Sequence, residues 1–259
     1  MDLGLRDKVV VVTGGTAGIG RSCVDAFLEE GSRVVVCGRS EGRLEEFRKE
    51  YEGRPVLAVR ADVSSPEDME ALARAAAEHF GGIDVWVNNA GIYPKGNLED
   101  MPLDMWRETF AVNVDGVLYG SRAAIPYLRK AGGGVIVNAS SYASIMPTGG
   151  RGAYGVTKAA VSQMTRVMAA ELAPDHIRVV AYMPGFVLTG INAAVIGEYD
   201  DGAVKRQAVQ NRYGRTEEIA RLVVFLASDA ASFITGCGVE ASGGKYCVQN
   251  PFAAWEKGN

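Results

Sequence analysis

The sequence predicts an α/β fold with a doubly wound, mostly parallel sheet of seven strands and helices on both faces. Three observations support this prediction. Short runs of β-branched residues alternate with helical patterns, a glycine-rich turn joins the first run to the first helix, and polar or small residues follow several runs. Such alternation requires right-handed crossovers, which place parallel strands side by side beneath layers of helices.

The composition is that of an ordinary globular protein. The 259 residues are 47% hydrophobic and 22% charged, with a formal net charge of −4. This length suits one large α/β domain or two small ones, and because no linker divides the chain we expect a single domain over residues 1–259. The basic residues are scattered, and no apolar run resembles a signal core or a membrane span. We therefore expect a cytoplasmic protein that binds neither nucleic acid nor membrane.

The cysteines give no sign of a metal site. Cys23 and Cys37 lie in core-like segments, and Cys237 and Cys247 are not spaced like metal ligands. Two histidines are too few for a histidine metal site. We interpret the cysteines as thiols in a reducing compartment and expect no bound metal.

The first strand is predicted over residues 8–12, which are rich in valine, and a helix follows that Gly31 ends. Between them the chain has glycines spaced Gly14-x-x-x-Gly18-x-Gly20. Glycines let the backbone approach a diphosphate, and the free N–H groups at a helix start point at the anion. The candidate cofactor residues of this turn are Gly14, Thr16, Gly18, Ile19 and Gly20.

A second strand, predicted over residues 33–37, ends at Gly38 and Arg39. In a dinucleotide-binding unit an acidic residue near this point would bind the adenosine ribose 2′-hydroxyl. Gly38 has no side chain for that role, and the guanidinium of Arg39 suits a 2′-phosphate. The pattern favours NADP(H), with NAD(H) as the alternative, unless Arg39 is only a solvated loop charge or stacks on adenine.

The third and fourth strands are predicted over residues 55–60 and 83–87, with a helix over 66–80 between them. The fourth strand ends in the polar and small residues 88–91, at the edge where parallel sheets bind ligands. A long helix is then predicted from Leu103 to about Lys130. It carries Asn113 among apolar neighbours, either as a structural hydrogen-bonding group or as one that bends the helix and positions a water.

The fifth strand, over residues 134–138, leads into two serines and then a helix with Tyr154 and Lys158. Their spacing of four places the phenol and the ammonium on one helical face. Tyrosine has a pKa near ~10, and a nearby cation lowers it while a serine hydroxyl binds the substrate oxygen. The motif by itself is equally compatible with an accidental surface pair.

The remaining elements complete the sheet. A sixth strand over residues 177–183 runs into Pro184 and Gly185, and a short final strand is predicted at 238–240 after a helix over 217–228. We interpret the irregular segment at about 186–213 as a substrate flap, and residues from about 245 to 259 as a C-terminal tail.

Together these motifs resemble the short-chain dehydrogenase/reductase family, in its order and spacing, from about Lys8 to Gly244. The residues that carry the resemblance are Thr13-Gly14-x-x-x-Gly18-x-Gly20, Asn88-Asn89-Ala90-Gly91, Asn113, Ser141, Tyr154-x-x-x-Lys158 and Pro184-Gly185. The resemblance implies a single-domain Rossmann-type oxidoreductase, usually a homotetramer, that uses NAD(P) to interconvert a secondary alcohol and a ketone.

The resemblance also implies roles for individual residues. Tyr154 would exchange the proton with the substrate oxygen, Lys158 would bind the nicotinamide ribose and lower the tyrosine pKa, and Asn113 would hold a relay water. Ser141 matches the catalytic serine, which leaves Ser140 as a structural hydroxyl. The further implied cofactor contacts are Asp62 and Val63 at adenine, Asn89, Ala90 and Gly91 at adenosine, Pro184 and Gly185, Val187 at the carboxamide, and Thr189 at the carboxamide or diphosphate.

Four residues are candidates for the walls of the substrate pocket: Tyr93, Tyr142, Arg151 and Phe186. Arg151 stands three residues before Tyr154, which in the family faces the substrate. It could bind an anionic group, or it could pair with the flap or face solvent. Many family members end their last strand with Val-Asp-Gly-Gly, whereas this chain has Val239-Glu240-Ala241-Ser242-Gly243-Gly244 there. The tail that follows carries Tyr246, Phe252 and Trp255. These aromatics would pack at a subunit interface or close a neighbouring pocket.

Two function classes follow from these motifs. The first is a carbonyl or 3-oxoacyl reductase, or a small polyol or alcohol dehydrogenase, acting on a small molecule. The second is a nucleotide-binding sensor or scaffold of the same fold. The presence of Asn113, Ser141, Tyr154 and Lys158 together favours the enzyme, because a sensor has no need of an acid–base group.

Overall fold

Seven short runs of β-branched and apolar residues form one sheet in the part of the chain that the computed structural model describes, residues 2–190, 201–245, 247–253 and 255. The strands are β1 (Val9–Thr13), β2 (Arg33–Gly38), β3 (Val56–Arg60), β4 (Val85–Asn88), β5 (Gly134–Ala139), β6 (Ile177–Pro184) and β7 (Gly238–Ala241). The α-helices are α1 (Gly18–Glu29), α2 (Glu41–Glu50), α3 (Pro66–Phe80), α4 (Leu103–Phe110), α5 (Gly116–Lys130), α6 (Gly152–Leu172), α8 (Asp201–Lys205) and α9 (Thr216–Ala227).

The sheet has the order β3-β2-β1-β4-β5-β6-β7, and every neighbouring pair is parallel. This confirms the predicted seven-stranded, doubly wound arrangement. The strand order reverses between β1 and β4, so the chain after β1 and the chain after β4 leave the sheet side by side. A crevice at such a switch point, at the carboxyl ends of the strands, is where open α/β sheets bind ligands.

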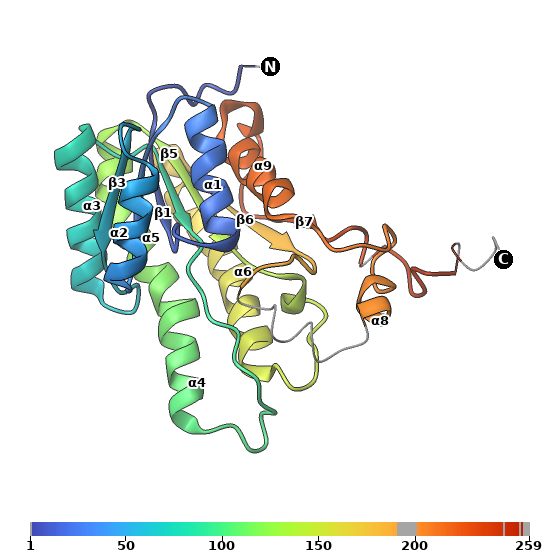
Figure 1. Cartoon of the computed structure of the whole chain (residues 1–259). Coiled ribbons are helices and arrows are strands. Elements are labelled where there is room, and N and C mark those ends of the chain that lie inside the picture. Colours follow the sequence, from blue (N-terminus) through green and yellow to red (C-terminus); the bar gives the residue numbers. More distant parts are fainter. Residues whose placement is uncertain (1, 191–200, 246, 254, 256–259) are drawn as a thin grey trace.

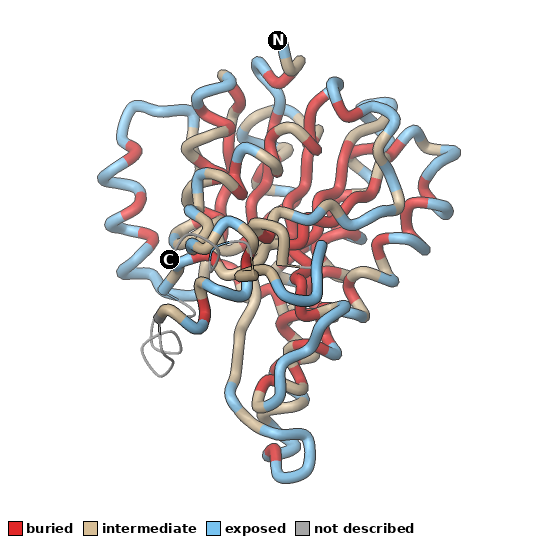
Figure 2. Tube along the Cα trace, turned by 90° about the vertical axis from the view of Figure 1, so that its right-hand side faces the viewer, coloured by how far each residue is buried: buried red, intermediate tan, exposed pale blue. Residues whose placement is uncertain are grey.

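Helices cover both faces of the sheet (Figure 1). One apolar core joins alternate strand residues to α1, α2 and α9, and a second joins the intervening strand residues to α3, α5 and α6. Figure 2 shows the buried positions concentrated along the sheet and the inner sides of these helices. The five inner strands are largely buried on both faces, which explains why they are mostly continuous apolar runs rather than alternating patterns, whereas the edge strands β3 and β7 are partly exposed.

Local sequence explains the limits of α3. Ser65 accepts a hydrogen bond from the Asp68 N–H at the start, Pro66 occupies the first turn, and Gly81 ends the helix with φ +95°. A side-chain oxygen, an early proline and a left-handed glycine satisfy or remove the backbone groups that a helix end leaves unpaired. The predicted range for this helix is therefore confirmed.

Two helical features differ from the predictions. The helix predicted from Leu103 to about Lys130 is interrupted by a π-helical turn at Ala111–Asp115, which separates α4 from α5. The helix α2 was missed, because its charged sequence has a weak apolar pattern, although Ser40 caps it and Leu44 and Phe47 are buried.

The predicted flap is described only in part. Residues 191–200 lie outside the described residues, while 201–205 form α8 and Val187 bridges to Gly214. Among the helices that the structure describes, none combines the length and the hydropathy of a membrane span.

Candidate active site

The four predicted catalytic residues come from three elements of the carboxyl edge of the sheet. Asn113 lies in the π-helical turn, Ser141 follows β5, and Tyr154 and Lys158 lie one turn apart on α6. Three of these residues are buried, with Asn113 0%, Ser141 3% and Lys158 4% exposed, whereas Tyr154 is half-buried. The structure thus brings together residues that are up to 45 positions apart in the sequence.

Of the two serines, Ser141 is the one beside the tyrosine. Its side chain hydrogen-bonds Tyr154 and accepts the Ala143 N–H at 3.1 Å. The Ser140 hydroxyl instead donates to the Lys158 carbonyl at 3.1 Å and lies 2.6 Å from the Ser162 hydroxyl. Ser140 therefore anchors β5 to α6, whereas Ser141 is placed to share a substrate oxygen with Tyr154.

Asn113 forms three side-chain hydrogen bonds. Its Oδ1 accepts the Ile92 N–H at 2.8 Å, and its Nδ2 donates to the Ile92 carbonyl at 2.9 Å and to Thr157 Oγ1 at 3.1 Å. Of the two alternatives from the sequence, the structural hydrogen-bonding role is visible here, in a turn that also departs from regular helix. Both amide hydrogens are used, and Oδ1 keeps one lone pair for a further donor.

Lys158 is held in the site by one hydrogen bond. Its Nζ donates to the Ala139 carbonyl at 2.8 Å and lies 5.5 Å from the centroid of the Tyr154 ring. Burial lowers the pKa of Lys158 from 10.5 to about 8, because the low-dielectric interior disfavours the ammonium form. A Cβ at Gly91 would lie 3.6 Å from Nζ and 3.1 Å from Asn113 Oδ1, so glycine there leaves room for both groups.

The pKa of Tyr154 differs from the sequence-based expectation. Burial raises it to about 12, and the hydrogen bond from Ser141, which lowers it, does not compensate. Burial therefore dominates the pKa of Tyr154, and its phenol is protonated at neutral pH. That Lys158 lowers this pKa stays a prediction.

The glycine-rich turn after β1 forms an open backbone cradle. Gly14 and Gly18 have φ values of +65° and +55°, which favour glycine. A Cβ at Gly20 would lie 2.4 Å from both Asn89 Nδ2 and the Gly14 carbonyl oxygen, so no side chain fits there. A Cβ at Gly18 would lie 3.5 Å from the Thr189 side chain, which places that predicted cofactor residue across from the turn. The turn and the start of α1 therefore fit a nucleotide diphosphate.

Two residues, Thr13 and Asn89, hold this cradle against β4, and the sequence motif had given Thr13 no role of its own. The Thr13 hydroxyl accepts the Asn89 and Ala90 N–H groups at 3.0 and 3.1 Å. The Asn89 carboxamide donates to the Thr13 and Gly14 carbonyls and accepts the Tyr182 hydroxyl. The Asn89 side chain therefore fixes the turn from behind. The signal for Thr13 was its place at the end of a buried strand, directly before the first glycine.

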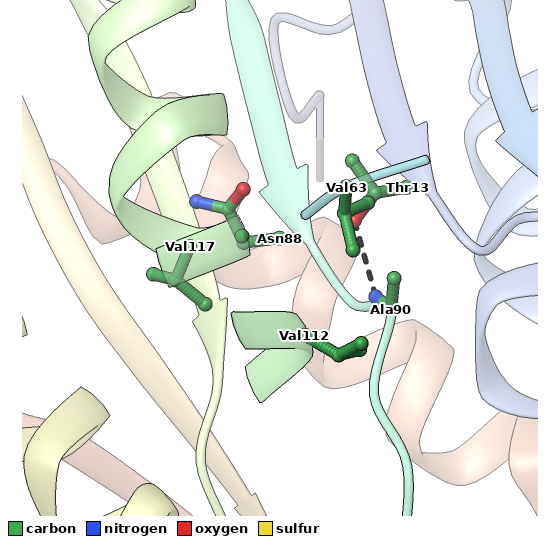
Figure 3. Close-up of a pocket in the computed structure, with 7 residues that line it drawn as sticks. Thr13, Val63, Asn88, Ala90, Val112 and Val117 are labelled. Carbon is green, nitrogen blue, oxygen red and sulfur yellow. Dashed lines mark hydrogen bonds between the residues drawn. The ribbon is translucent and has the colours of Figure 1, made fainter. Parts of the chain in front are cut away.

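A narrow crevice opens beside the cradle, between the ends of β1 and β4 and the start of α5 (Figure 3). Its lining residues are Thr13, Val63, Asn88, Ala90, Val112, Gly116 and Val117. The predicted adenine-side residues Val63 and Ala90 are both in this set. Behind it, Asn88 accepts the Trp86 indole N–H and donates to Ser121 and Asn138, a buried polar network that supports the strand ends.

Arg39 and Asp62, predicted for the adenosine end, lie near each other. The Arg39 Nη1 is 3.9 Å from Asp62 Oδ2, and the Arg39 side chain is 59% exposed. Burial would raise the pKa of Asp62, but hydrogen bonds from Ser64 and the charge of Arg39 outweigh it and lower that pKa. Gly38 faces Thr16, since a Cβ there would lie 3.5 Å from Thr16 Oγ1. The cation of Arg39 is accessible to a ligand.

The segment after β6 passes close to β7 and forms one wall. A Cβ at Gly185 would lie 2.7 Å from the Ser242 Cα, so only glycine at position 185 lets the two backbones come this close. Phe186 packs on Tyr142 with ring centroids 5.1 Å apart. Lys245 Nζ lies 4.7 Å from the centroid of each ring, a contact that the sequence analysis did not anticipate.

The tail contacts its own chain in the described residues. The Trp255 indole N–H donates to the Val209 carbonyl at 2.8 Å, and the Phe252 ring lies 5.6 Å from the Arg206 guanidinium carbon. Tyr246 lies outside the described residues. The expectation that these aromatics pack at an interface or close a neighbouring pocket stays a prediction.

Comparison with known proteins agrees with this geometry. A family model described as enoyl-(acyl carrier protein) reductase matches residues 14–245. The chain is 36% identical over 254 residues to trans-4-hydroxycyclohexanecarboxylate dehydrogenase from Sinomonas cyclohexanicum, with 95% of each chain covered. It is 39% identical over 245 residues to 3β-hydroxysteroid dehydrogenase 1 from Eggerthella lenta, with 93% of this chain and 94% of the relative covered.

A solved structure gives the same result. The crystal structure of a short-chain type dehydrogenase/reductase from Mycobacterium marinum superposes with a TM-score of 0.89 at 32% identity, covering 95% of this chain and 99% of the other. Fold, site and relatives define an NAD(P)-dependent oxidoreductase that interconverts a secondary alcohol and a ketone. The chain belongs to the short-chain dehydrogenase/reductase family. Both relatives named here are dehydrogenases, so the comparisons support the enzyme and not the sensor.

Proposed function

We propose that the protein is an NADP(H)-preferring dehydrogenase/reductase whose substrate is a ring-bearing secondary alcohol or its ketone. The observation that carries the proposal is the hydrogen bond between a half-buried Tyr154 and Ser141, one helical turn from Lys158, at the edge of a diphosphate cradle. The two relatives compared above are named for alicyclic hydroxy compounds, and the aromatic wall of Tyr142 and Phe186 suits a flat apolar ring.

Each residue has a role in this reaction. The turn at Gly14–Gly20 and the start of α1 would hold the diphosphate, and Val63 and Ala90 would flank the adenine. The nicotinamide supplies the hydride for reduction or accepts it in oxidation. Ser141 and Tyr154 bind the substrate oxygen, and Tyr154 donates its proton to that oxygen as the ketone is reduced, or removes it as the alcohol is oxidised. Lys158, adjacent to Tyr154, would bind the nicotinamide ribose and restore the proton.

The proposal is tested by supplying NADPH and NADH with a panel of cyclic and open-chain ketones, and NADP⁺ and NAD⁺ with the matching alcohols. Cyclic substrates are expected to have a higher kcat/KM than open-chain substrates. For each substrate, kcat/KM is expected to be higher with NADP(H) than with NAD(H). Turnover of open-chain substrates only would contradict the ring preference, and absence of turnover with every pair would contradict the proposed activity.

The cofactor preference depends on Arg39. Replacing Arg39 by alanine removes the accessible cation beside Asp62, so KM for NADPH is expected to rise about 10-fold, the worth of one charge-assisted hydrogen bond. KM for NADH is expected to stay within about 2-fold, because NADH has no 2′-phosphate for the guanidinium. The control is Arg43→Ala in α2, also an exposed arginine. Equal changes for the two cofactors would exclude a 2′-phosphate contact.

The pH dependence should differ between the two reaction directions. Because burial raises the pKa of Tyr154 to about 12, its protonated form is present throughout the neutral range. Ketone reduction, which needs the acid, is expected to be nearly independent of pH between about 6 and 8. Alcohol oxidation needs the phenolate and should accelerate as pH rises. Initial rates in both directions across this range test the assignment; an oxidation rate that is flat or falls would contradict it.

We also propose that the protein is a cytoplasmic homotetramer, as the family resemblance implies. Light scattering after size-exclusion chromatography would test the oligomer, with a mass near four times the 27.5 kDa chain as the expected result.

A further inference from the structure

The structure contains a buried cation that the reaction above does not use. Arg151 is only 4% exposed, and its Nε is buried without a hydrogen-bond partner. No ion pair joins its guanidinium to any residue in the described part of the chain. This excludes the alternative that the side chain faces solvent. Removing an ion from water without a counter-charge costs several kcal/mol, so a buried and unpaired arginine calls for a functional explanation.

The position of Arg151 increases this cost. It directly precedes α6, a helix of 21 residues whose first turn contains no acidic residue. The amino end of a helix carries a partial positive charge and favours an anion, not a cation. Arg151 also bridges to Gly96, in the segment that leaves β4 and runs away from the sheet beside the start of α6 (Figure 1). Arg151 therefore lies at the amino end of α6, against the segment that follows β4.

One aromatic ring connects Arg151 to the catalytic centre. Its guanidinium carbon lies 4.6 Å from the centroid of the Tyr93 ring, and that ring meets Tyr154 edge to face, with centroids 4.5 Å apart and an interplanar angle of 83°. A cation over an aromatic face gains ~2 kcal/mol when desolvated, which offsets only part of the cost of burial. Tyr93 thus sets the separation between the guanidinium and the tyrosine that takes the proton.

We propose that Arg151 binds a carboxylate of the substrate, about one ring's width from the reacting carbon. This inference rests on the proposed function and narrows its substrate class to cyclic hydroxy or oxo carboxylic acids. A single unpaired cation is balanced by a monoanion, and the planar guanidinium matches a carboxylate with two parallel hydrogen bonds. With the acid bound, its carboxylate offsets the charge of the guanidinium, and the substrate ring lies alongside Tyr93 toward Ser141 and Tyr154.

The test compares an acid with its neutral analogues in the presence of saturating NADPH or NADH. The probes are 4-oxocyclohexanecarboxylate, its methyl ester and 4-methylcyclohexanone. Wild type should reduce the acid with the highest kcat/KM. Arg151→Met should lower kcat/KM for the acid about 100-fold and leave the two neutral ketones within about 3-fold. Arg151→Lys keeps the positive charge but lacks the two parallel N–H donors of the guanidinium, so its kcat/KM for the acid should lie between those of Arg151→Met and wild type.

The matched control is Arg33→Met. Arg33 is a partly exposed arginine at the amino end of β2, whereas Ser141 follows the carboxyl end of β5, and it pairs with Asp7 at 3.1 Å. It should leave all three ketones unaffected. Equal losses on acid and neutral ketones in Arg151→Met would show a structural role and overturn the proposal. If Arg151→Met lost only the acid while the neutral ketones were still reduced, both the proposal and the activity would stand.

A binding measurement decides the question even without turnover. Cyclohexanecarboxylate should raise the Tm of the cofactor-loaded wild type in a concentration-dependent manner, and should fail to do so for Arg151→Met. Cyclohexanol should shift both equally, and inorganic phosphate at the same concentration should shift neither. A shift by phosphate would indicate a different anion and overturn the carboxylate assignment, as would a shift by cyclohexanecarboxylate that survives in Arg151→Met. Failure of every ketone together with a carboxylate shift would reject the activity alone.

Discussion

Replacing Tyr154 by phenylalanine is expected to lower kcat for ketone reduction by at least about 10³-fold, because the variant loses the group that donates the proton. The ring and its edge-to-face contact with Tyr93 are kept, so the fold should change little. Loss of one neutral hydrogen bond to Ser141 should lower the free energy of unfolding by only about 1 kcal/mol. Steady-state rates, cofactor titration by fluorescence and urea unfolding measure the three quantities.

A matched control separates proton transfer from general damage. Tyr119→Phe removes a phenol from α5, where the ring is half-buried and outside the proposed site. It should keep full activity. The Tyr154→Phe variant should also bind NADPH within about 3-fold of wild type, since hydride transfer and nucleotide binding use different groups. Activity above about a tenth of wild type in Tyr154→Phe would show that another group transfers the proton.

Replacing Lys158 by methionine is expected to have opposite effects on activity and stability. The variant should lose about 10²-fold or more in kcat, because it lacks the cation next to Tyr154. At pH 7 the free energy of unfolding of the variant should be about 2 kcal/mol higher than that of wild type, so the variant should be more stable. Lowering the pKa from 10.5 to about 8 corresponds to about 3 kcal/mol of penalty on the buried ammonium. The variant also loses the hydrogen bond to the Ala139 carbonyl, which reduces this gain in stability by about 1 kcal/mol.

The stability difference should depend on pH in a direction that linkage determines. Below about pH 8 both folded and unfolded wild type carry the protonated lysine, so the folded state bears the whole penalty. Between about 8 and 10.5 the unfolded chain binds more protons than the folded one, and wild-type stability rises with pH relative to Lys158→Met. Urea unfolding of both proteins from pH 7 to 10 should show the gap closing. A gap that is constant or widens would contradict the depressed pKa.

The sequence alone predicted the seven strands in order and a catalytic set that the structure brings together. Buried parallel strands leave runs such as residues 9–12 and 33–37, and a Tyr-x-x-x-Lys spacing defines one face of a helix, so both are local signals. The choice of Ser141 over Ser140 was also available there. The sequence did not predict α2, because only Leu44 and Phe47 form its apolar face among many charged residues. It also did not predict the π-helical turn that contains Asn113.

Only the tertiary structure decided the ionisation of the site and its outer contacts. The spacing of Tyr154 and Lys158 on α6 predicts that the lysine lowers the pKa of the tyrosine, whereas burial, which only the folded chain creates, raises the pKa of Tyr154 and lowers that of Lys158. Likewise, the sequence does not distinguish Arg151 from an ordinary charged loop residue, whereas the structure shows it buried against Tyr93. Spacing along the chain specifies which side chains share a face, whereas desolvation and contacts between distant segments arise only when the whole chain is folded.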